Sequence, residues 1–292
     1  MISIIITAYK EEKTIGKAIE YILKNKIPDS YEILVLAPDE KTLDEARKYS
    51  KNNKKIKVIK DSGKGKPSAL NQAFDLAKGN LLILTDGDVY MSENSISELL
   101  KSFEDPNIGA VSGRPISLNS RSDKLGFWSH LLTDTAHERR KIALKSGKRF
   151  YCSGYLYAMR NKIVDKIPEE TLSDDGFISH LIYSKAYKLD YRPNAEVHVR
   201  FPTNLKDWIA QKKRSAGGYN QIKNWTNVEI RSFSKESFGV FQVLNYPKNL
   251  REFFWTLELI FIRIYLWVLI FLDINIRKKS LKKIWVRIDS TK

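Results

Sequence analysis

Leu81-Leu-Ile-Leu-Thr-Asp86-Gly-Asp88 is a run of aliphatic residues that ends on two carboxylates separated by one glycine. An apolar run of this length is typical of a buried strand in a parallel sheet, so its end brings Asp86 and Asp88 to one edge of the sheet. Ligands of open α/β sheets bind at that edge, and paired carboxylates there commonly hold a divalent cation that also contacts phosphate. A plain Asp-Gly turn accounts for the same residues equally well.

Aliphatic runs alternate with helix-like segments on both sides of this stretch, through the first 115 residues. Repeated strand–helix units predict an α/β fold with a mostly parallel sheet flanked by helices. The predicted strands are 2–7, 31–37, 56–59, 81–85 and 108–112, and the predicted helices between them are 14–24, 42–51, 67–78 and 95–103. Further helices are predicted at 123–146, 172–185 and 205–224, and strand-like patches within 149–160.

Length and composition indicate a globular protein. A chain of 292 residues with 42% hydrophobic residues can form one large domain, or one domain with an appendage. The single cysteine, Cys152, excludes an internal disulfide and suits a reducing compartment. The apolar start, residues 2–6, is short and gives way to charged residues, so we interpret it as a first strand and not as a signal peptide.

The net charge of +16 is concentrated in the second part of the chain. Residues 1–100 hold 16 Lys and Arg against 15 Asp and Glu, whereas the remainder holds 34 against 19. A basic surface of this kind could attract nucleic acid, anionic lipid headgroups or a phosphorylated acceptor. No nucleic-acid-binding motif accompanies the charge, so a nucleic acid partner is not predicted.

The last 45 residues combine an apolar segment with basic flanks. Residues 253–274 are nearly long enough to span a bilayer but include Glu258, Arg263 and Asp273. We therefore expect a helix in the membrane interface, or a shallow re-entrant hairpin, and an amphipathic helix packed on the domain or in a dimer is the alternative. Residues 280–288 place apolar side chains among basic ones, as in a membrane-surface helix that binds anionic lipid.

Two further segments have the chemistry of nucleotide binding. In Thr7-Ala8-Tyr9-Lys10-Glu11-Glu12 the tyrosine ring can stack on a base and a carboxylate can accept hydrogen bonds from ribose or base, although these residues also suit an ordinary helix start. In residues 62–71 glycines precede a helix start, where the helix N-terminus favours an anion and Lys66 adds a positive charge. A solvated lysine loop is the alternative, and the spacing of a Walker P-loop is absent.

In this order the motifs resemble glycosyltransferase family 2, the inverting nucleotide-sugar enzymes of the GT-A fold, over about residues 1–220. The resemblance implies that Asp86 faces the ribose or the metal and that Asp88 coordinates Mg²⁺ or Mn²⁺ on the donor diphosphate. Asp39 is the best substitute for the family's base-contacting acid after the second strand, and it could equally be a helix N-cap. The implied donor-binding residues are Thr7, Ala8, Tyr9, Glu11, Asp39, Lys66 and Asp86.

Past residue 150 the resemblance is to the cellulose- and hyaluronan-synthase branch. Tyr151-Cys152-Ser153-Gly154 is similar to its acceptor-site segment, which makes Cys152 a packed side chain and not a nucleophile. Ser173-Asp174-Asp175 is similar to its Thr-Glu-Asp, whose last residue removes the acceptor proton, although helix capping also explains these acids. Gln211 and Arg214 match Gln-x-x-Arg-Trp, with Ser215 in place of the tryptophan, and Arg214 could also be a surface cation. The implied residues around the acceptor and diphosphate are Ser153, Gly154, Tyr155, Asp174, Gln211 and Arg214, with Asp175 as the catalytic base.

Together these features predict a metal-dependent, inverting glycosyltransferase in three parts, 1–115, 116–228 and 229–292. The donor is a nucleoside diphosphate sugar, with UDP favoured over GDP, and the acceptor a hydroxyl of a glycan or lipid-linked glycan at the cytoplasmic face of the membrane. One alternative is transfer to a polyprenyl phosphate, which needs no base. Another is a catalytically inactive nucleotide-sugar-binding scaffold, because the second-strand acids and the motif tryptophan are missing.

Overall fold

The computed structural model describes residues 1–28, 30–228, 243–272 and 288–291. The chain divides into two compact units. The sheet unit contains residues 1–116 and 140–199, and the helical unit contains residues 117–139 and 200–291. The three-part division suggested by the sequence stays a prediction.

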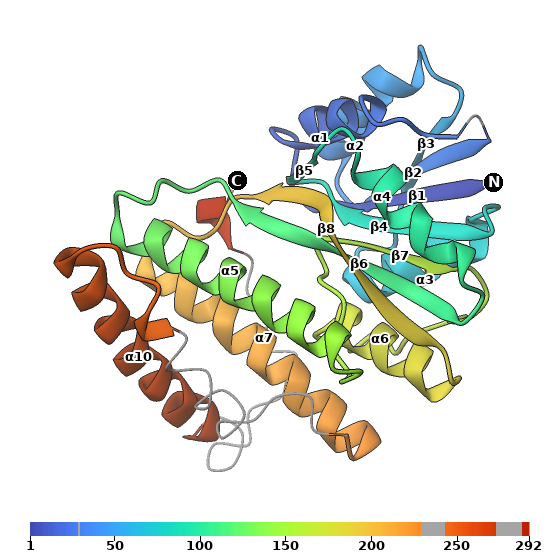
Figure 1. The fold of residues 1–292 in the computed structure, drawn as a ribbon. Helices are drawn as coiled ribbons and strands as arrows, with labels where there is room; N and C mark the ends of the chain where they lie inside the picture. Colours follow the sequence, from blue (N-terminus) through green and yellow to red (C-terminus); the bar gives the residue numbers. More distant parts are fainter. Residues whose placement is uncertain (29, 229–242, 273–287, 292) are drawn as a thin grey trace. The chain divides into compact units, whose positions relative to one another are not determined.

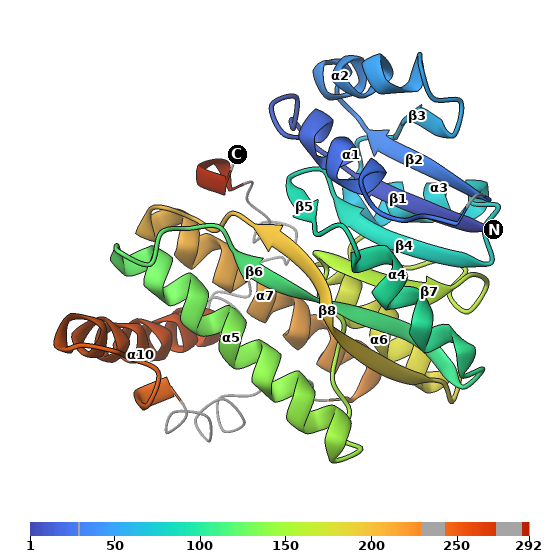
Figure 2. The ribbon, with the colours of Figure 1, turned by 45° about the horizontal axis from the view of Figure 1, so that its top comes forward.

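The sheet unit contains a mixed sheet with the strand order β3-β2-β1-β4-β7-β6-β8-β5 (Figures 1 and 2). The predicted parallel part is confirmed, because β1 pairs in parallel with β2 and β4, and β2 with β3. The other pairs with a described register are antiparallel: β4 with β7, β6 with β7, and β5 with β8. The strands are β1 (Ile2–Thr7), β2 (Tyr31–Ala37), β3 (Ile56–Lys60), β4 (Leu81–Asp86), β5 (Val89–Met91), β6 (Ile108–Ser117), β7 (Leu156–Arg160) and β8 (Lys188–Val199).

The predicted helices are present, with ends shifted by a few residues. The sheet unit contains α1 (Ile15–Leu23), α2 (Glu40–Ser50), α3 (Lys66–Leu76), α4 (Ser95–Leu100), the 3-10 helix η1 (Lys101–Glu104) and α6 (Asp174–Ser184). The helical unit contains α7 (Leu205–Thr226), α10 (Leu250–Phe271) and the 3-10 helix η4 (Asp289–Thr291), and α5 (Lys124–Lys145) begins there. Residues 250–271 form one continuous helix and not the arms of a hairpin. Most of the predicted segment 280–288, and Asp273, lie outside the described residues.

Two strands were not predicted, β5 and β8. In β8 the side chains of Tyr191, Ala195 and Val197 are buried at alternate positions, which is the period of a strand. Pro193 and several charged residues interrupt that pattern in the sequence, and a proline usually argues against a strand inside a sheet. The buried alternation becomes visible only once the neighbouring strands are in place.

Gly87 allows the end of β4 to approach the end of β1 closely. Its backbone N–H donates to the carbonyl oxygen of Thr7 over 3.1 Å. A Cβ atom at Gly87 would overlap Glu11 Oε2 and lie 2.9 Å from the Cβ of Ala8. The glycine between the two aspartates is therefore required by packing against the segment that follows β1.

The helical unit is held by an aromatic cluster between α5, α7 and α10, which lie side by side in Figures 1 and 2. The rings of Trp128 on α5 and Trp208 on α7 are 5.4 Å apart and tilted. Leu259 supplies the α10 side of the cluster and is buried. The indole N–H of Trp128 donates to the carbonyl oxygen of Trp255 over 2.7 Å, so the α5 side chain also holds the backbone of α10.

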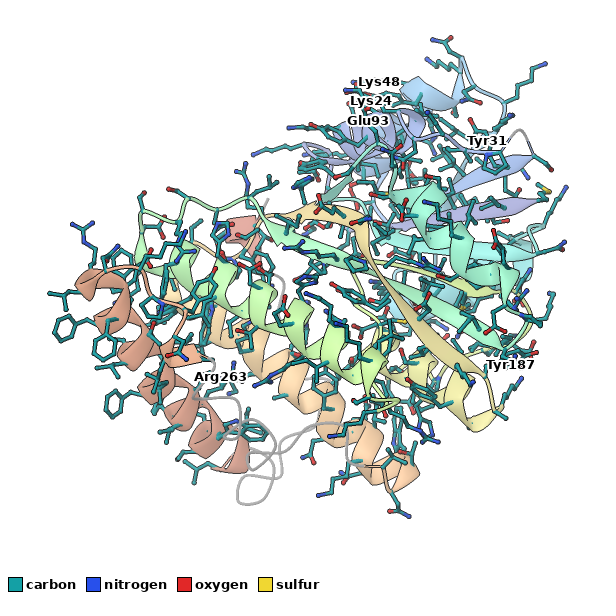
Figure 3. All side chains as sticks on the ribbon, in the orientation of Figure 1. Lys24, Tyr31, Lys48, Glu93, Tyr187 and Arg263 are labelled. Carbon is teal, nitrogen blue, oxygen red and sulfur yellow. The ribbon has the colours of Figure 1, made fainter. Side chains whose placement is uncertain are left out.

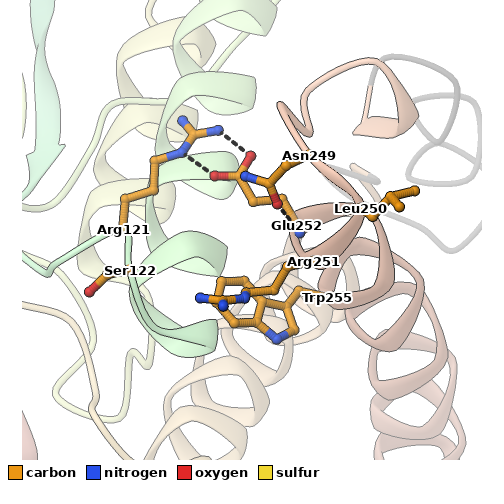
Figure 4. Close-up of a pocket in the computed structure, with 7 residues that line it drawn as sticks. All are labelled: Arg121, Ser122, Asn249, Leu250, Arg251, Glu252 and Trp255. Atoms are coloured by element: carbon orange, nitrogen blue, oxygen red, sulfur yellow. Dashed lines mark hydrogen bonds and ion pairs between the residues drawn. The ribbon is translucent and has the colours of Figure 1, made fainter.

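An ion pair fastens the start of α10 (Figure 4). Arg121 donates from Nε to Glu252 Oε1 over 2.8 Å and from a terminal nitrogen to Glu252 Oε2 over 2.9 Å. The hydroxyl of Tyr246 accepts from the same guanidinium and donates to Asp134 Oδ2. Hydrogen bonds from Arg121 lower the pKa of Glu252 to about 2. The pair lies in a surface pocket of about 610 Å³ at the start of α10.

We expect Glu252→Gln to destabilise the helical unit by about 2 kcal/mol at pH 7, because it leaves Arg121 without its anionic partner. The pair lowers the pKa of Glu252 from 4.5 in the unfolded chain. The contribution of the pair to the free energy of unfolding is therefore complete above pH 4.5 and is lost as the pH falls toward 2. The difference between wild type and variant should therefore shrink at pH 3. Denaturant unfolding followed by tryptophan fluorescence reports this unit, since it holds all six tryptophans: Trp128, Trp208, Trp225, Trp255, Trp267 and Trp285.

Glu258→Gln is the matched control for this measurement. Glu258 pairs with Lys124 over 2.7 Å, but its side chain is 53% exposed, so the change should cost less than about 0.5 kcal/mol. Equal losses of unfolding free energy in Glu252→Gln and Glu258→Gln would contradict a special role for the pair of Arg121 with Glu252. A difference between wild type and Glu252→Gln that does not change with pH would also contradict it.

We expect Gly87→Ala to lower the free energy of unfolding of the sheet unit by about 1–3 kcal/mol, because the added methyl group has no space. The main overlap is with the carboxylate of Glu11, so the same change should cost less in a Glu11→Ala background. Scanning calorimetry of the four proteins gives the comparison. An equal cost in both backgrounds would show that the Glu11 contact does not exclude a side chain at this position.

Candidate functional site

The ammonium group of Lys66 lies between two carboxylates that come from distant parts of the sequence. Lys66 Nζ is 2.7 Å from Asp86 Oδ1 and 3.4 Å from Asp174 Oδ2. Lys66 is the first residue of α3, Asp86 the last of β4 and Asp174 the first of α6. Gly65, just before α3, has φ of +107°, which favours glycine, so the local sequence permits the sharp entry into the helix. The first residues of α3 and α6 and the last residue of β4 therefore meet at the ammonium group of Lys66.

Two carboxylates, of Asp86 and Asp174, face the single ammonium group of Lys66 and change its pKa. Burial alone would lower the pKa of Lys66, but Asp174 and Asp86 outweigh it and raise the pKa, so the ammonium stays charged. Burial raises the pKa of Asp174, and Asp175 and Asp86 add to the rise, while Lys66 opposes it. The oxygen Asp174 Oδ2 is buried without a hydrogen bond among the described residues. This excess of carboxylate can accept a further cation.

Asp175, the predicted base, is fixed in position by three hydrogen bonds. Asp175 Oδ1 accepts from the hydroxyl of Ser173 over 2.7 Å and from the backbone N–H of Gly176 over 2.8 Å. Asp175 Oδ2 accepts from the backbone N–H of Gly154 over 2.9 Å. Each carboxylate oxygen has two lone pairs, so these bonds leave one acceptor position on Oδ2. The carboxylate is thus oriented, and one lone pair on Oδ2 stays open to accept a hydrogen bond from a hydroxyl group.

The predicted acceptor segment lies against the carboxylate of Asp175. A Cβ atom at Gly154 would be 3.2 Å from Asp175 Oδ2, so glycine lets the backbone come close. The neighbours of Gly154 are held in turn, since the N–H of Ser153 donates to the Ser112 hydroxyl and the carbonyl of Tyr155 accepts from Thr85. The structure therefore brings residues 153–155 to the same point as Asp175 and the end of β4.

Cys152 and Tyr157 flank the same acids from the interior. Burial raises the pKa of Cys152 to about 12, which keeps the thiol protonated and agrees with a packed side chain. The hydroxyl of Tyr157 is buried without a hydrogen bond among the described residues, and burial and then Asp174 raise its pKa. In the sequence Tyr157 gives no signal of a place at this site, because its position in β7 resembles that of any aromatic residue in a strand.

The residues that are predicted to bind the nucleobase of the donor follow the ends of β1 and β2. Asp39 accepts from the backbone N–H of Lys10 over 2.8 Å and from the N–H and hydroxyl of Thr42, so it caps α2 and also holds the loop after β1. Tyr9 is 39% exposed, with the ammonium of Lys10 5.3 Å from its ring centre. Ala8 and Glu11 are buried. Asp39 is therefore the N-cap of α2, and its contact with the nucleobase of the donor stays a prediction.

The acids at the end of β4, Asp86 and Asp88, suit a hard cation that is shared with a diphosphate. Among the described residues, no group of three or more His, Cys, Asp or Glu could hold a metal ion by itself. Asp86 and Asp88 supply carboxylate oxygens, the ligands that Mg²⁺ and Mn²⁺ prefer. Mg²⁺ commonly takes one or two carboxylates and completes its coordination with phosphate oxygens and water. Asp86, which contacts Lys66, and Asp88, two residues further along the chain, fit that arrangement.

Gln211 and Arg214 lie on α7 in the helical unit, three positions apart in the sequence. The oxygen Gln211 Oε1 is buried and has no hydrogen bond among the described residues, and an unsatisfied buried oxygen often marks a place for water or ligand. Their predicted contact with the diphosphate or acceptor stays a prediction.

Curated relatives of the chain are glycosyltransferases in name. A probable glycosyltransferase, YdaM of Bacillus subtilis, is 26% identical over 76% of this chain and 56% of its own length. The beta-monoglucosyldiacylglycerol synthase of Nostoc is 22% identical over 79% of this chain and 52% of its length. A hyaluronan synthase of Streptococcus pyogenes is 25% identical over 63% of this chain and 43% of its length. The chain thus spans about half the length of these relatives.

Solved structures share the fold. The mannosyltransferase PcManGT of Pyrobaculum calidifontis, in complex with GDP-Man and Mn²⁺, matches with a TM-score of 0.61 and 17% identity, over 88% of this chain and 73% of its own. TarS of S. aureus in complex with UDP matches with a TM-score of 0.50 and 15% identity, over 82% and 78% of the two chains. These likenesses confirm the predicted GT-A architecture.

The family assignment rests on a match that covers more than half of the chain. A model of the family described as "Glycosyl transferase family 2" matches residues 3–167, which include most of β1, the Lys66 loop, Asp86 and Asp88 at the end of β4, and residues 153–155. The resemblance inferred from the motifs is confirmed. This chain belongs to glycosyl transferase family 2.

Proposed function

We propose that the chain transfers a sugar, with inversion, from a nucleoside diphosphate sugar to a hydroxyl of a glycan or lipid-linked glycan. The observation that carries the proposal is the position of Asp175. Its carboxylate is oriented by Ser173, Gly176 and the acceptor-segment residue Gly154, and it lies within the charged group formed by Lys66 and Asp174. An oriented base beside a diphosphate-binding cation is what a single displacement at a sugar carbon requires.

The donor end uses the residues around β4. Asp86 and Asp88 would hold Mg²⁺ or Mn²⁺, which when bound neutralises charge that develops on the departing diphosphate. Lys66 approaches the same diphosphate from the start of α3, where the helix N-terminus also favours an anion. Lys66 thereby exchanges its contact with Asp86 for one with a phosphate oxygen.

Asp175 acts on the acceptor. Its open Oδ2 position accepts the proton of the acceptor hydroxyl, whose oxygen forms the new bond to the anomeric carbon. The bond from that carbon to the diphosphate oxygen breaks at the same time, and the nucleoside diphosphate leaves with the electron pair. One displacement from the opposite side inverts the configuration.

The comparisons support the donor class and leave its identity to experiment. One neighbour was solved with GDP-Man and another with UDP, and two relatives are named for lipid or polysaccharide products. We retain UDP as the expected nucleotide, with GDP as its competitor. The apolar helix α10 and the basic residues that follow it support a membrane-associated enzyme, which we assign to the cytoplasmic face.

We expect Asp175→Asn to lower kcat by at least about 10²-fold, because the acceptor hydroxyl loses its base. Release of nucleoside diphosphate is measured with UDP- and GDP-sugars and with glycan, lipid-linked and polyprenyl phosphate acceptors. Asp165→Asn, at an exposed position, should retain activity. Activity that survives Asp175→Asn with polyprenyl phosphate would favour that acceptor, since an ionised phosphate needs no base.

We expect Mn²⁺ together with UDP or GDP to raise the unfolding temperature of the protein, because a ligand that binds only the folded state stabilises it. Asp88→Asn should remove the part of this shift that depends on Mn²⁺. Asp75→Asn is the control, since Asp75 is 63% exposed. Absence of a shift with every nucleotide would contradict donor binding, and a shift without turnover would favour the scaffold alternative.

A further inference from the structure

The helix α10 is apolar on two opposite faces. On its inner face the side chains of Leu259, Leu266 and Ile270 are each at least 93% buried. Its outer face carries large apolar side chains that are about half or more exposed: Leu250, Phe254, Phe261, Ile264, Tyr265 and Val268. A helix of a water-soluble domain normally presents polar side chains on its outer face. The outer face of α10 therefore lacks the composition expected of a surface in water.

The outer face is a continuous strip without charge. Its residues recur at intervals of three, four and seven, which places them on one side of the helix from its first turn to its last. The nearest charged side chains, Arg251 and Glu258, lie along one edge of the strip. Glu258 is held toward α5 by its pair with Lys124, and Arg251 lies over the ring of Trp255 at 5.8 Å from the ring centre (Figure 4).

We propose that α10 lies flat in the surface of an anionic membrane, with the outer face in the boundary of the acyl chains and the inner face packed on the helical unit. In this arrangement the helix does not cross the bilayer. The inference deepens the membrane association proposed above and does not depend on which sugar is transferred.

The contacts of the inner face argue against crossing. By length and composition, Leu250–Ile270 is long and apolar enough to span a bilayer. Spanning would separate Glu252 from Arg121 and the carbonyl of Trp255 from the Trp128 indole. It would also carry Glu258 and Arg263 toward the hydrocarbon, and Figure 3 shows Arg263 on the side of α10 toward α7. Charges at such depth are costly, whereas a flat helix leaves all these contacts intact.

Charge favours a lipid surface over a second copy of the chain. The helical unit contains 20 Lys and Arg and 10 Asp and Glu, an excess of +10, so two such units would repel each other. Lys248 and Arg251 are exposed at the start of α10, and six more basic residues occur within 277–287 of the sequence. Anionic headgroups attract such a surface. Among the exposed side chains of the outer face, the hydroxyl of Tyr265 is the one group that can form a hydrogen bond, whereas protein interfaces carry about one hydrogen bond per 100–200 Å². This composition suits lipid better than a protein partner.

The first test measures binding of the full chain to vesicles of phosphatidylglycerol and phosphatidylcholine, and to vesicles of phosphatidylcholine alone. We expect binding to the anionic vesicles, and at least about tenfold weaker binding for Phe254→Glu/Phe261→Glu, since two large side chains lose their apolar contact. The control, Ile142→Glu/Leu144→Glu, adds the same charge at apolar residues of α5 that are 49% and 41% exposed and should bind as wild type does.

The second test distinguishes a flat helix from a spanning one. Cysteines at 254, 261 and 268 share the outer face, and Cys152 is the sole native cysteine and is buried, so a fluorophore would label the new thiols. Lipids with quenchers at two depths then report the depth of each label. A flat helix places the three labels at one depth, whereas a spanning helix separates the first and last by about 21 Å along its axis. Leu76→Cys, in the sheet unit, gives an exposed reference label.

Three results would overturn the proposal. Labels at graded depths would show a spanning helix, and labels that remain in water would show that the face does not enter lipid. A wild-type dimer that becomes monomeric in Phe254→Glu/Phe261→Glu, without vesicle binding by either protein, would assign the face to a second copy. The thermal shift with nucleotide and Mn²⁺ is measured on the same variants, so loss of lipid binding is distinguished from failure of the proposed transferase function.

Discussion

One ammonium group, on Lys66, compensates the carboxylates that gather where β4, α3 and α6 meet. Without that positive charge Asp86 and Asp174 would repel each other in a partly buried place, and the ends of the three elements would separate. The contact therefore stabilises the fold and sets the chemistry of the site. The group remains acidic overall, because Asp175 adds a third carboxylate, and a site with this balance is suited to a donor that arrives with its own divalent cation.

The backbone makes this crowding of charge possible. Gly87 and Gly154 stand where a methyl group would collide with Glu11 or press on Asp175, so each glycine lets a main chain approach a carboxylate. The N–H of Gly154 then becomes one of the donors that orient the predicted base. In the helical unit a partly buried ion pair has a comparable effect on the start of α10, because Arg121 satisfies both oxygens of Glu252. With its inner face fastened in this way, α10 can leave a second apolar face uncovered.

Local pattern predicted much of the sheet, since β1, β2 and β4 are buried on both faces and appear as uninterrupted apolar runs. The same reasoning missed β8, where Pro193 and charged residues mask the alternation of buried side chains. The motifs predicted that Lys66, Asp86 and Asp175 share one site; the structure brings the three side chains together, and their roles stay predictions. Tyr157 and the hydroxyl of Ser112, which support the site, gave no such signal, because nothing in their own neighbourhood distinguishes them from residues of an ordinary core.

The amino-acid order alone was enough for the α/β class, the family resemblance and the place of the two aspartates at the end of β4, because periodicity, strand-end acids and glycine-rich turns are local properties of a chain. It left open whether Asp174 and Asp175 cap a helix or face a ligand, and whether the apolar C-terminal segment spans, packs or lies on a membrane. Tertiary contacts decided how these residues are placed, since the Lys66 pair, the donors around Asp175 and the inner face of α10 each join residues that are far apart in sequence. Such contacts depend on which elements become neighbours, and no local pattern specifies that.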